Sequence, residues 1–166
     1  MKKFLITLAT AAAVLGLAGA SQAEPSFAVI KMATRVDRSA AETWAKVGKF
    51  CDLGTWLKID CAITFGDGGI GTVRSIAGGR VTEIMVAQTE LSYGYTQPVT
   101  PGKAYDLYHG FLEARPVSAT SSQLIYTLFY DASALPDEAA RMADINRRRT
   151  MFEGALKAMK TTAEAK

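Results

Sequence analysis

Residues 71 to 84 read GTVRSIAGGRVTEI, and this stretch fixes how two strands of the protein pair. Gly78 and Gly79 stand between two alternating runs rich in β-branched residues. This pattern is typical of a two-residue hairpin, because glycine enters the positive-φ turns that match the twist of paired strands. With these glycines as the turn, Arg74 faces Glu83 in a closely spaced pair. The sequence therefore predicts that two opposite charges meet across neighbouring strands.

Strand-like runs continue on both sides of this hairpin, from residue 59 to about residue 132, and are separated by short breaks rich in turn-forming residues. Because each break is short, neighbouring strands should pair antiparallel. An alternating run near the start of the chain adds a seventh strand. The expected strands are residues 26–36, 59–66, 70–77, 80–88, 92–97, 103–115 and 122–131.

Two helical regions frame these strands. Ser39 and Glu42 have the spacing of a capping box, so a helix should begin there and end near residues 52–54. A longer helix should begin at Pro136, a proline at the first helical position followed by acids that complement the helix dipole, and should run to about Lys160. Its inward stripe is expected to comprise Met142, Ile145, Phe152, Leu156 and Met159, with Arg149 interrupting it.

The order of these elements predicts an α+β fold. One face of a seven-stranded antiparallel sheet must be covered, and only the final helix is long enough to cover it. We therefore expect a helix-grip architecture, in which a curled sheet wraps around a long C-terminal helix.

The first 23 residues form a segment of their own, with Lys2 and Lys3 followed by an apolar stretch and a small-residue end at Ala23. This is typical of a signal peptide, which predicts a periplasmic protein whose mature chain is a single domain of residues 24–166. Without the leader, 17 Lys and Arg against 16 Asp and Glu leave a net charge of +1. We therefore expect neither nucleic-acid binding nor stable membrane insertion after the leader is removed.

Cys51 and Cys61 are the only cysteines in the sequence. In an oxidising compartment two cysteines usually form a disulfide, which would close a short loop here. Two buried free thiols are the alternative, and the export signal favours the disulfide.

The order of elements, together with several local patterns, resembles the START-like or Bet v 1-like (SRPBCC) superfamily, and within it the polyketide cyclase/dehydrase-like branch. None of these patterns is a catalytic signature. The residues that carry the resemblance are 36–39, 42–44, 50–56, the G-x-V-R step at 71–74, Glu83, Tyr95 and 152–160. The resemblance implies an apolar cavity between the sheet and the last helix, which relatives use for lipids, sterols, polyketides or plant hormones. Because one fold hosts many functions, function must be argued from the site.

Arg74 and Glu83 are the first candidate site residues. They could form an exposed pair of little energetic weight, or they could face the cavity, where the arginine would present its remaining donors to a ligand. Their face of the hairpin also carries Thr72, Ile76, Val81 and Met85. This largely apolar face favours the interior, since a buried charge is tolerated only with a partner.

Aromatic residues of the next two strands and three residues of the last helix complete the candidate site. Tyr105 and His109 share one face of their expected strand, and a lone histidine cannot make a histidine-rich metal site. The sequence contains no nucleophile elbow and no phosphate-binding glycine loop, so we expect no metal, no cofactor and no catalytic residue. The expected ligand-binding residues are Arg74, Glu83, Tyr95, Tyr105, His109, Met142, Arg149 and Phe152.

Three functions fit this sequence. The favoured one is binding, without chemical change, of a small hydrophobic molecule such as a lipid, a fatty acid or a polycyclic compound. The second is an accessory protein that contacts a periplasmic protein partner, because secreted relatives of similar size resemble accessory proteins of periplasmic methanol oxidation. The third is a cyclase or dehydratase with Tyr95 or His109 as its acid or base, although the absence of an oriented catalytic group weighs against an enzyme.

Overall fold

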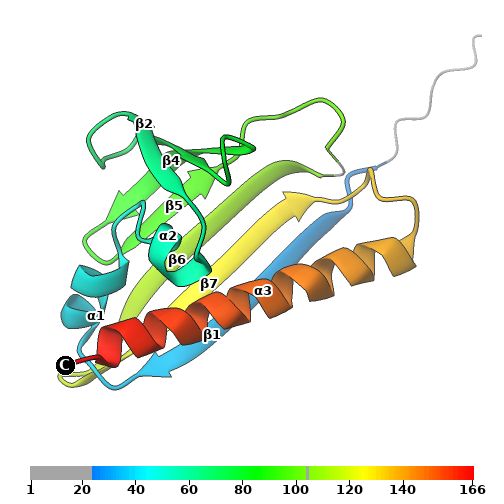
Figure 1. The fold of residues 1–166 in the computed structure, drawn as a ribbon. Helices are drawn as coiled ribbons and strands as arrows, with labels where there is room; N and C mark the ends of the chain where they lie inside the picture. Colours follow the sequence, from blue (N-terminus) through cyan, green and yellow to red (C-terminus); the bar gives the residue numbers. More distant parts are fainter. Residues whose placement is uncertain (1–23, 104) are drawn as a thin grey trace, which may run out of the picture.

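The computed structural model describes residues 24–103 and 105–166, so the expected leader lies outside the described residues. The structure has the predicted α+β architecture, in which a long helix lies across one face of a curled antiparallel sheet (Figure 1). In chain order the elements are β1 (Phe27–Val36), α1 (Ala40–Val47), α2 (Leu53–Leu57), β2 (Cys61–Phe65), β3 (Val73–Ile76), β4 (Val81–Thr89), β5 (Ser92–Thr96), β6 (Asp106–Ser118), β7 (Ser121–Asp131) and α3 (Glu138–Glu164).

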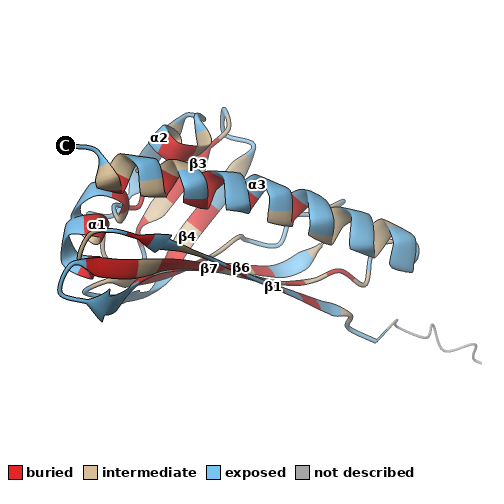
Figure 2. Ribbon diagram, turned by 90° about the horizontal axis from the view of Figure 1, so that it is seen from below, coloured by how far each residue is buried: buried red, intermediate tan, exposed pale blue. Residues whose placement is uncertain are grey.

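The seven strands lie in the order β1-β7-β6-β5-β4-β3-β2, and every neighbouring pair is antiparallel. Strands β2 to β7 follow one another along the sheet because their connections are short. The first strand, β1, instead lies beside β7 and forms one edge of the sheet, while β2 forms the other edge. In the sequence, α1 and α2 connect these two edge strands. Buried positions gather on the face that looks toward α3 (Figure 2).

The hairpin at residues 71–84 has the predicted register, with Arg74 opposite Glu83. The turn differs from the expected two-residue form, because Ala77 also adopts a positive φ of 56° next to Gly78 and Gly79. A non-glycine residue is seldom found in this region. The backbone N–H of Gly78 donates to the carboxylate of Asp60 at 2.7 Å, which helps to hold the wider turn.

The first helix begins as the sequence predicts. The Ser39 side chain accepts from the backbone N–H of Glu42, and the Glu42 carboxylate accepts from the backbone N–H of Ser39 at 3.0 Å. These two bonds satisfy amides that a helix start would otherwise leave unpaired. The start of α3 differs from the prediction, because Asp137 rather than Pro136 borders the helix and accepts from the N–H of Ala140.

The buried stripe of α3 also differs from the predicted one at its N-terminal end. Met142 is 43% exposed, because the first turns of α3 lie away from α1 and α2 (Figure 1). The arginine that faces inward is Arg148 and not Arg149. Both positions lie one helical turn before Phe152, so helical spacing alone permits either. The buried residues of α3 are Arg148, Phe152, Ala155, Leu156, Met159 and Ala163.

The predicted disulfide is present and joins the connection between α1 and α2 to the first residue of β2. The Cα atoms of Cys51 and Cys61 lie 5.6 Å apart, and the described residues contain no free cysteine. The bond ties Phe50 and its neighbours to the edge of the sheet.

We predict that replacing both cysteines by alanine lowers the free energy of unfolding by about 2–3 kcal/mol, because the unfolded chain regains the freedom that the closed loop removes. Urea denaturation with and without a reductant measures this. The reductant should destabilise the natural chain and leave the double variant unchanged. Equal effects on both would contradict a stabilising disulfide.

Candidate functional site

A cavity of about 290 Å³ lies between α2, the middle of α3 and the inner face of the sheet. This is just below the roughly 300–1,000 Å³ typical of small-molecule pockets. Most of its wall is apolar or aromatic, and its charged groups come from β3, β4 and α3. The lining residues are Leu53, Trp56, Leu57, Ile59, Arg74, Ile76, Ala77, Val81, Glu83, Tyr95, Gln97, Tyr105, Tyr108, Tyr126, Arg147, Arg148, Met151 and Phe152.

The Arg74–Glu83 pair lies in the wall of this cavity and is almost fully buried, with 1% and 3% of each residue exposed. The Nε of Arg74 donates to Oε2 of Glu83 at 2.7 Å, and its Nη1 donates to the backbone carbonyl of Phe50. The guanidinium also lies 3.9 Å from the centre of the Phe50 ring. Burial opposes the charge on Arg74, but the neighbouring oxygens of Tyr93 and Glu83 outweigh it and raise the pKa of the guanidinium.

A chain of hydrogen bonds extends from this ion pair along the cavity wall. The side-chain amide of Gln97 donates to Oε1 of Glu83 at 3.0 Å, and the Tyr105 hydroxyl donates to the Gln97 carbonyl at 3.1 Å. Both oxygens of Glu83 therefore accept hydrogen bonds from the protein. Buried charges require such partners to offset the loss of water.

Tyr95 and Tyr126 form a second polar pair in the wall. Their hydroxyl oxygens lie 2.8 Å apart, and both side chains are buried. Burial raises the pKa of both hydroxyls well above the usual value, so both stay neutral at physiological pH. The Tyr95 ring lies against Gly110, where an added Cβ would come within 2.3 Å of the ring. Glycine at this position makes room for the tyrosine in the interior.

Arg148 enters the cavity from α3 between three tyrosine rings. Its guanidinium carbon lies 4.5 Å from the centres of the Tyr105 and Tyr130 rings and 5.2 Å from that of Tyr108. Its Nε donates to the Asp144 carboxylate at 2.7 Å, one helical turn earlier. These contacts explain why Arg148 rather than Arg149 turns inward, since ring faces attract a desolvated guanidinium.

Asp144 holds several groups in place at this end of the cavity. Its carboxylate accepts from Arg148, from Arg147 and from the Tyr130 hydroxyl, the last at 2.8 Å. Burial opposes the ionisation of Asp144, but the hydrogen bonds from Arg148 and Tyr130 outweigh it and lower the pKa of the carboxyl. Burial and the bond to Asp144 raise the pKa of Tyr130 to about 12.

The structure brings together five of the eight expected ligand-binding residues, which are Arg74, Glu83, Tyr95, Tyr105 and Phe152. His109 instead lies on the opposite face of the sheet, where its ring neighbours Phe111 and Phe129. A register shift between Asp106 and His109 reverses the alternation assumed for this strand.

The other two expected residues, Met142 and Arg149, also lie outside the cavity. Arg149 reaches the backbone carbonyl of Lys31 at 3.4 Å, and Met142 is exposed on the early turns of α3. The lining residues that were not expected include Trp56, Tyr108, Tyr126 and Arg148. Tyr126 could have been found from the strand period, whereas Tyr108 could not, because the register shift at the start of β6 places it on the inner face. Arg148 could not, since its inward position depends on rings from two other strands.

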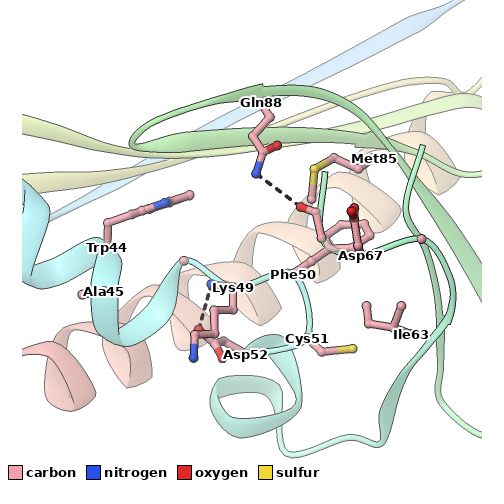
Figure 3. Close-up of a pocket in the computed structure, with 13 residues that line it drawn as sticks. Trp44, Ala45, Lys49, Phe50, Cys51, Asp52, Ile63, Asp67, Met85 and Gln88 are labelled. Carbon is pink, nitrogen blue, oxygen red and sulfur yellow. Dashed lines mark hydrogen bonds between the residues drawn. The ribbon is translucent and has the colours of Figure 1, made fainter. Parts of the chain in front are cut away.

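A second hollow of about 760 Å³ lies between α1, the β2–β3 loop and β4, and we call it the groove (Figure 3). It is wider and more open than the cavity, and its polar side chains are engaged locally. Asp52 accepts from the backbone N–H of Lys49, and Gln88 donates to the backbone carbonyl of Gly68. Phe50 and Met85 line the groove, and the Phe50 ring also contacts the Arg74 guanidinium of the cavity. The cavity, with its buried charged and aromatic groups, is therefore the candidate site.

Within residues 24–103 and 105–166, no three His, Cys, Asp or Glu side chains are grouped so that they could hold a metal ion. In this described part of the chain, no helix combines the length and the apolar character needed to cross a bilayer.

We predict that Glu83→Gln lowers the free energy of unfolding by about 3–5 kcal/mol, because it leaves Arg74 as an uncompensated buried charge. Combining Arg74→Met with Glu83→Leu should cost less than Glu83→Gln alone, since neither member of the pair then leaves an unpaired buried charge. Urea denaturation of each variant measures the costs. Arg115→Met is the control, because it breaks an exposed pair with Glu113 and should have little effect. An equally small effect of Glu83→Gln would contradict the interior role.

We further predict a pH-dependent effect of Asp144→Asn. Because the folded state lowers the pKa of Asp144, its stabilisation is fully present above the unfolded pKa of about 3.9 and is lost as the pH falls through the lower folded value. The natural chain should therefore be more stable than the variant at pH 7 and pH 5, and this advantage should shrink below about pH 4. Denaturation curves at pH 7, 5, 4 and 3 test this. An advantage that grows toward acid pH would contradict it.

Solved structures of other proteins share this fold. XoxI from Bacillus cereus matches with a TM-score of 0.66 and 20% identity, over 81% of this chain and 94% of that one. Ara h 8.0201 matches with a TM-score of 0.62 and 18% identity, over 83% and 98% of the two chains. The Zhui aromatase/cyclase from Streptomyces sp. R1128 matches with a TM-score of 0.65 and 17% identity, over 84% and 94%.

Comparisons of the sequence with protein-family models and with curated proteins find no match. The likeness to the solved structures is therefore one of fold, on which many functions can be built. The chain has the START-like, Bet v 1-like helix-grip fold, and it shares that fold with a polyketide aromatase/cyclase.

Proposed function

We propose that the protein binds a small hydrophobic molecule in the cavity beneath α3 and does not change it chemically. The observation that carries this proposal is a cavity with a mostly apolar and aromatic wall, whose buried ion pair is held by hydrogen bonds within the protein itself. Such a site combines an apolar body with a few placed polar groups, as small-molecule pockets do. The volume of about 290 Å³ favours a compact ligand, such as a polycyclic compound, over an extended lipid or fatty acid.

The proposed location is the periplasm. The Cys51–Cys61 disulfide supports an oxidising compartment, where such bonds form and persist. The composition of residues 1–23 supports export, although these residues lie outside the described part of the chain.

The positions of His109 and Tyr95, the two candidates for an acid or base, give a catalytic role less support than ligand binding. His109 is on the face of the sheet away from the cavity, and the Tyr95 hydroxyl is bonded to that of Tyr126. Burial further opposes the ionisation of Tyr95, which makes it a poor base at neutral pH.

An accessory protein of a periplasmic oxidation system is the second candidate function. The observation that favours it is the free edge of β2, where Ile63 and Phe65 are exposed, with Ile70 exposed in the following loop. An exposed apolar edge strand can pair with another chain. Genes for a dehydrogenase and a cytochrome beside the gene for this protein would support that role, and a chromosomal setting without them would count against it.

We predict that the neutral dye N-phenyl-1-naphthylamine binds saturably and that Val81→Trp abolishes this binding, because Val81 lines the cavity and a large ring would fill it. Thr82→Trp is the matched control, since the neighbouring side chain is exposed on the same strand. Fluorescence titration measures binding, and circular dichroism shows that both variants fold. Native mass spectrometry of protein from its own periplasm should reveal a bound small molecule. Dye binding that survives Val81→Trp would contradict the site.

A further inference from the structure

We infer that the ligand of the cavity is a compact organic anion, whose carboxylate or similar acidic group lies beside Arg147 and Arg148. This inference rests on the proposed function and adds the chemical class of the ligand. It follows from the balance of charge around the cavity, from the setting of Arg148 and from the acceptors of the wall, which already accept hydrogen bonds within the protein.

The charged groups at the cavity do not cancel. Three guanidinium groups line it, those of Arg74, Arg147 and Arg148, and Glu83 is the only carboxylate among the lining residues. Asp144 adds one more carboxylate, which Arg147 and Arg148 share. Three positive charges against two negative ones leave one positive charge in excess. The excess lies on the solvent side of the cavity, since the Arg147 side chain is 65% exposed, and it can attract an anion from solvent.

Arg148 is held so that it can meet that anion without rearrangement. Its Nε is committed to Asp144, and the rings of Tyr105, Tyr108 and Tyr130 surround its guanidinium. Among the described residues, Asp144 is the only carboxylate in an ion pair with Arg147 or Arg148. A planar guanidinium fixed in this way suits a carboxylate, which accepts two parallel hydrogen bonds.

The carboxylate and side-chain amide acceptors around the cavity already accept hydrogen bonds from the protein. Both oxygens of Glu83 accept hydrogen bonds, from Arg74 and Gln97, and both oxygens of Asp144 accept them as well. The side-chain carbonyl of Gln97 accepts from Tyr105. A ligand that offers only donors would therefore find these groups engaged.

One buried group of the wall that lacks a partner is a donor. The indole Nε1 of Trp56 is buried and has no hydrogen-bond partner among the described residues, and Trp56 lines the cavity. An indole N–H can only donate, so Trp56 adds no acceptor to the wall. The engaged acceptors and the excess positive charge thus favour the same ligand chemistry, which is an anion bearing oxygen acceptors.

A matched pair of probes tests this inference by isothermal titration calorimetry at pH 7 and low salt. We expect 2-naphthoate to bind the natural protein about tenfold more tightly than 2-naphthamide, which has a similar shape and no charge. The preference should fall as salt is added, because ions screen the attraction.

Arg147→Gln should reduce the preference for the anion to about threefold or less, because it removes the excess charge. Its side chain is 65% exposed, so the variant should fold. Arg149→Gln is the control, since it removes the same charge from the adjacent position, which lies outside the cavity. Arg148→Met should likewise abolish the preference, provided that circular dichroism shows native structure.

The possible failures of the two proposals can be told apart. Equal binding of naphthoate and naphthamide, or equal effects of Arg147→Gln and Arg149→Gln, would overturn the anionic ligand and leave cavity binding intact. If the natural protein binds neither probe and also fails to bind N-phenyl-1-naphthylamine, the proposed function is overturned together with this inference.

Discussion

The buried ion pair of Arg74 and Glu83 is the constraint on which the rest of the structure depends. A guanidinium with 1% of its surface exposed must find acceptors in the protein, and it finds them on two separate parts of the chain. The carboxylate comes from the neighbouring strand of the hairpin. The carbonyl of Phe50 comes from the connection between the first two helices, which the disulfide ties to β2. The pair therefore links the sheet to the helical segment that closes one end of the cavity.

The two buried arginines of the cavity are stabilised in different ways. Arg74 has its own carboxylate, and that carboxylate is further held by Gln97. Arg148 shares Asp144 with Arg147 and relies on the faces of three tyrosines for the remainder of its surroundings. The first arrangement is complete within the protein, whereas the second leaves positive charge available. The polar chemistry of the cavity is thus structural in the β3–β4 wall, and under our inference the arginines of α3 are the groups that meet the ligand.

Much of the fold could be predicted because its signals are local. The paired glycines fixed the register of Arg74 and Glu83, and the Ser39–Glu42 spacing marked the start of a helix. The predictions were wrong at positions where residues far away in the sequence determine which way a side chain points. The register shift at the start of β6 places His109 on the outer face of the sheet, and no local sequence pattern indicates such a shift. The inward arginine of α3 was misplaced by one position, because rings from β6 and from the adjoining loop and β7 select between two equally spaced candidates.

The two hollows of the protein each contain one of its two tryptophans. Trp44 lines the groove and Trp56 lines the cavity, and the sequence has no others. Indole emission responds to the polarity and proximity of whatever lies beside the ring, so each hollow carries its own natural optical reporter. Fluorescence from variants that keep only one of the two tryptophans would show whether a ligand has entered the cavity or the groove, without any attached label.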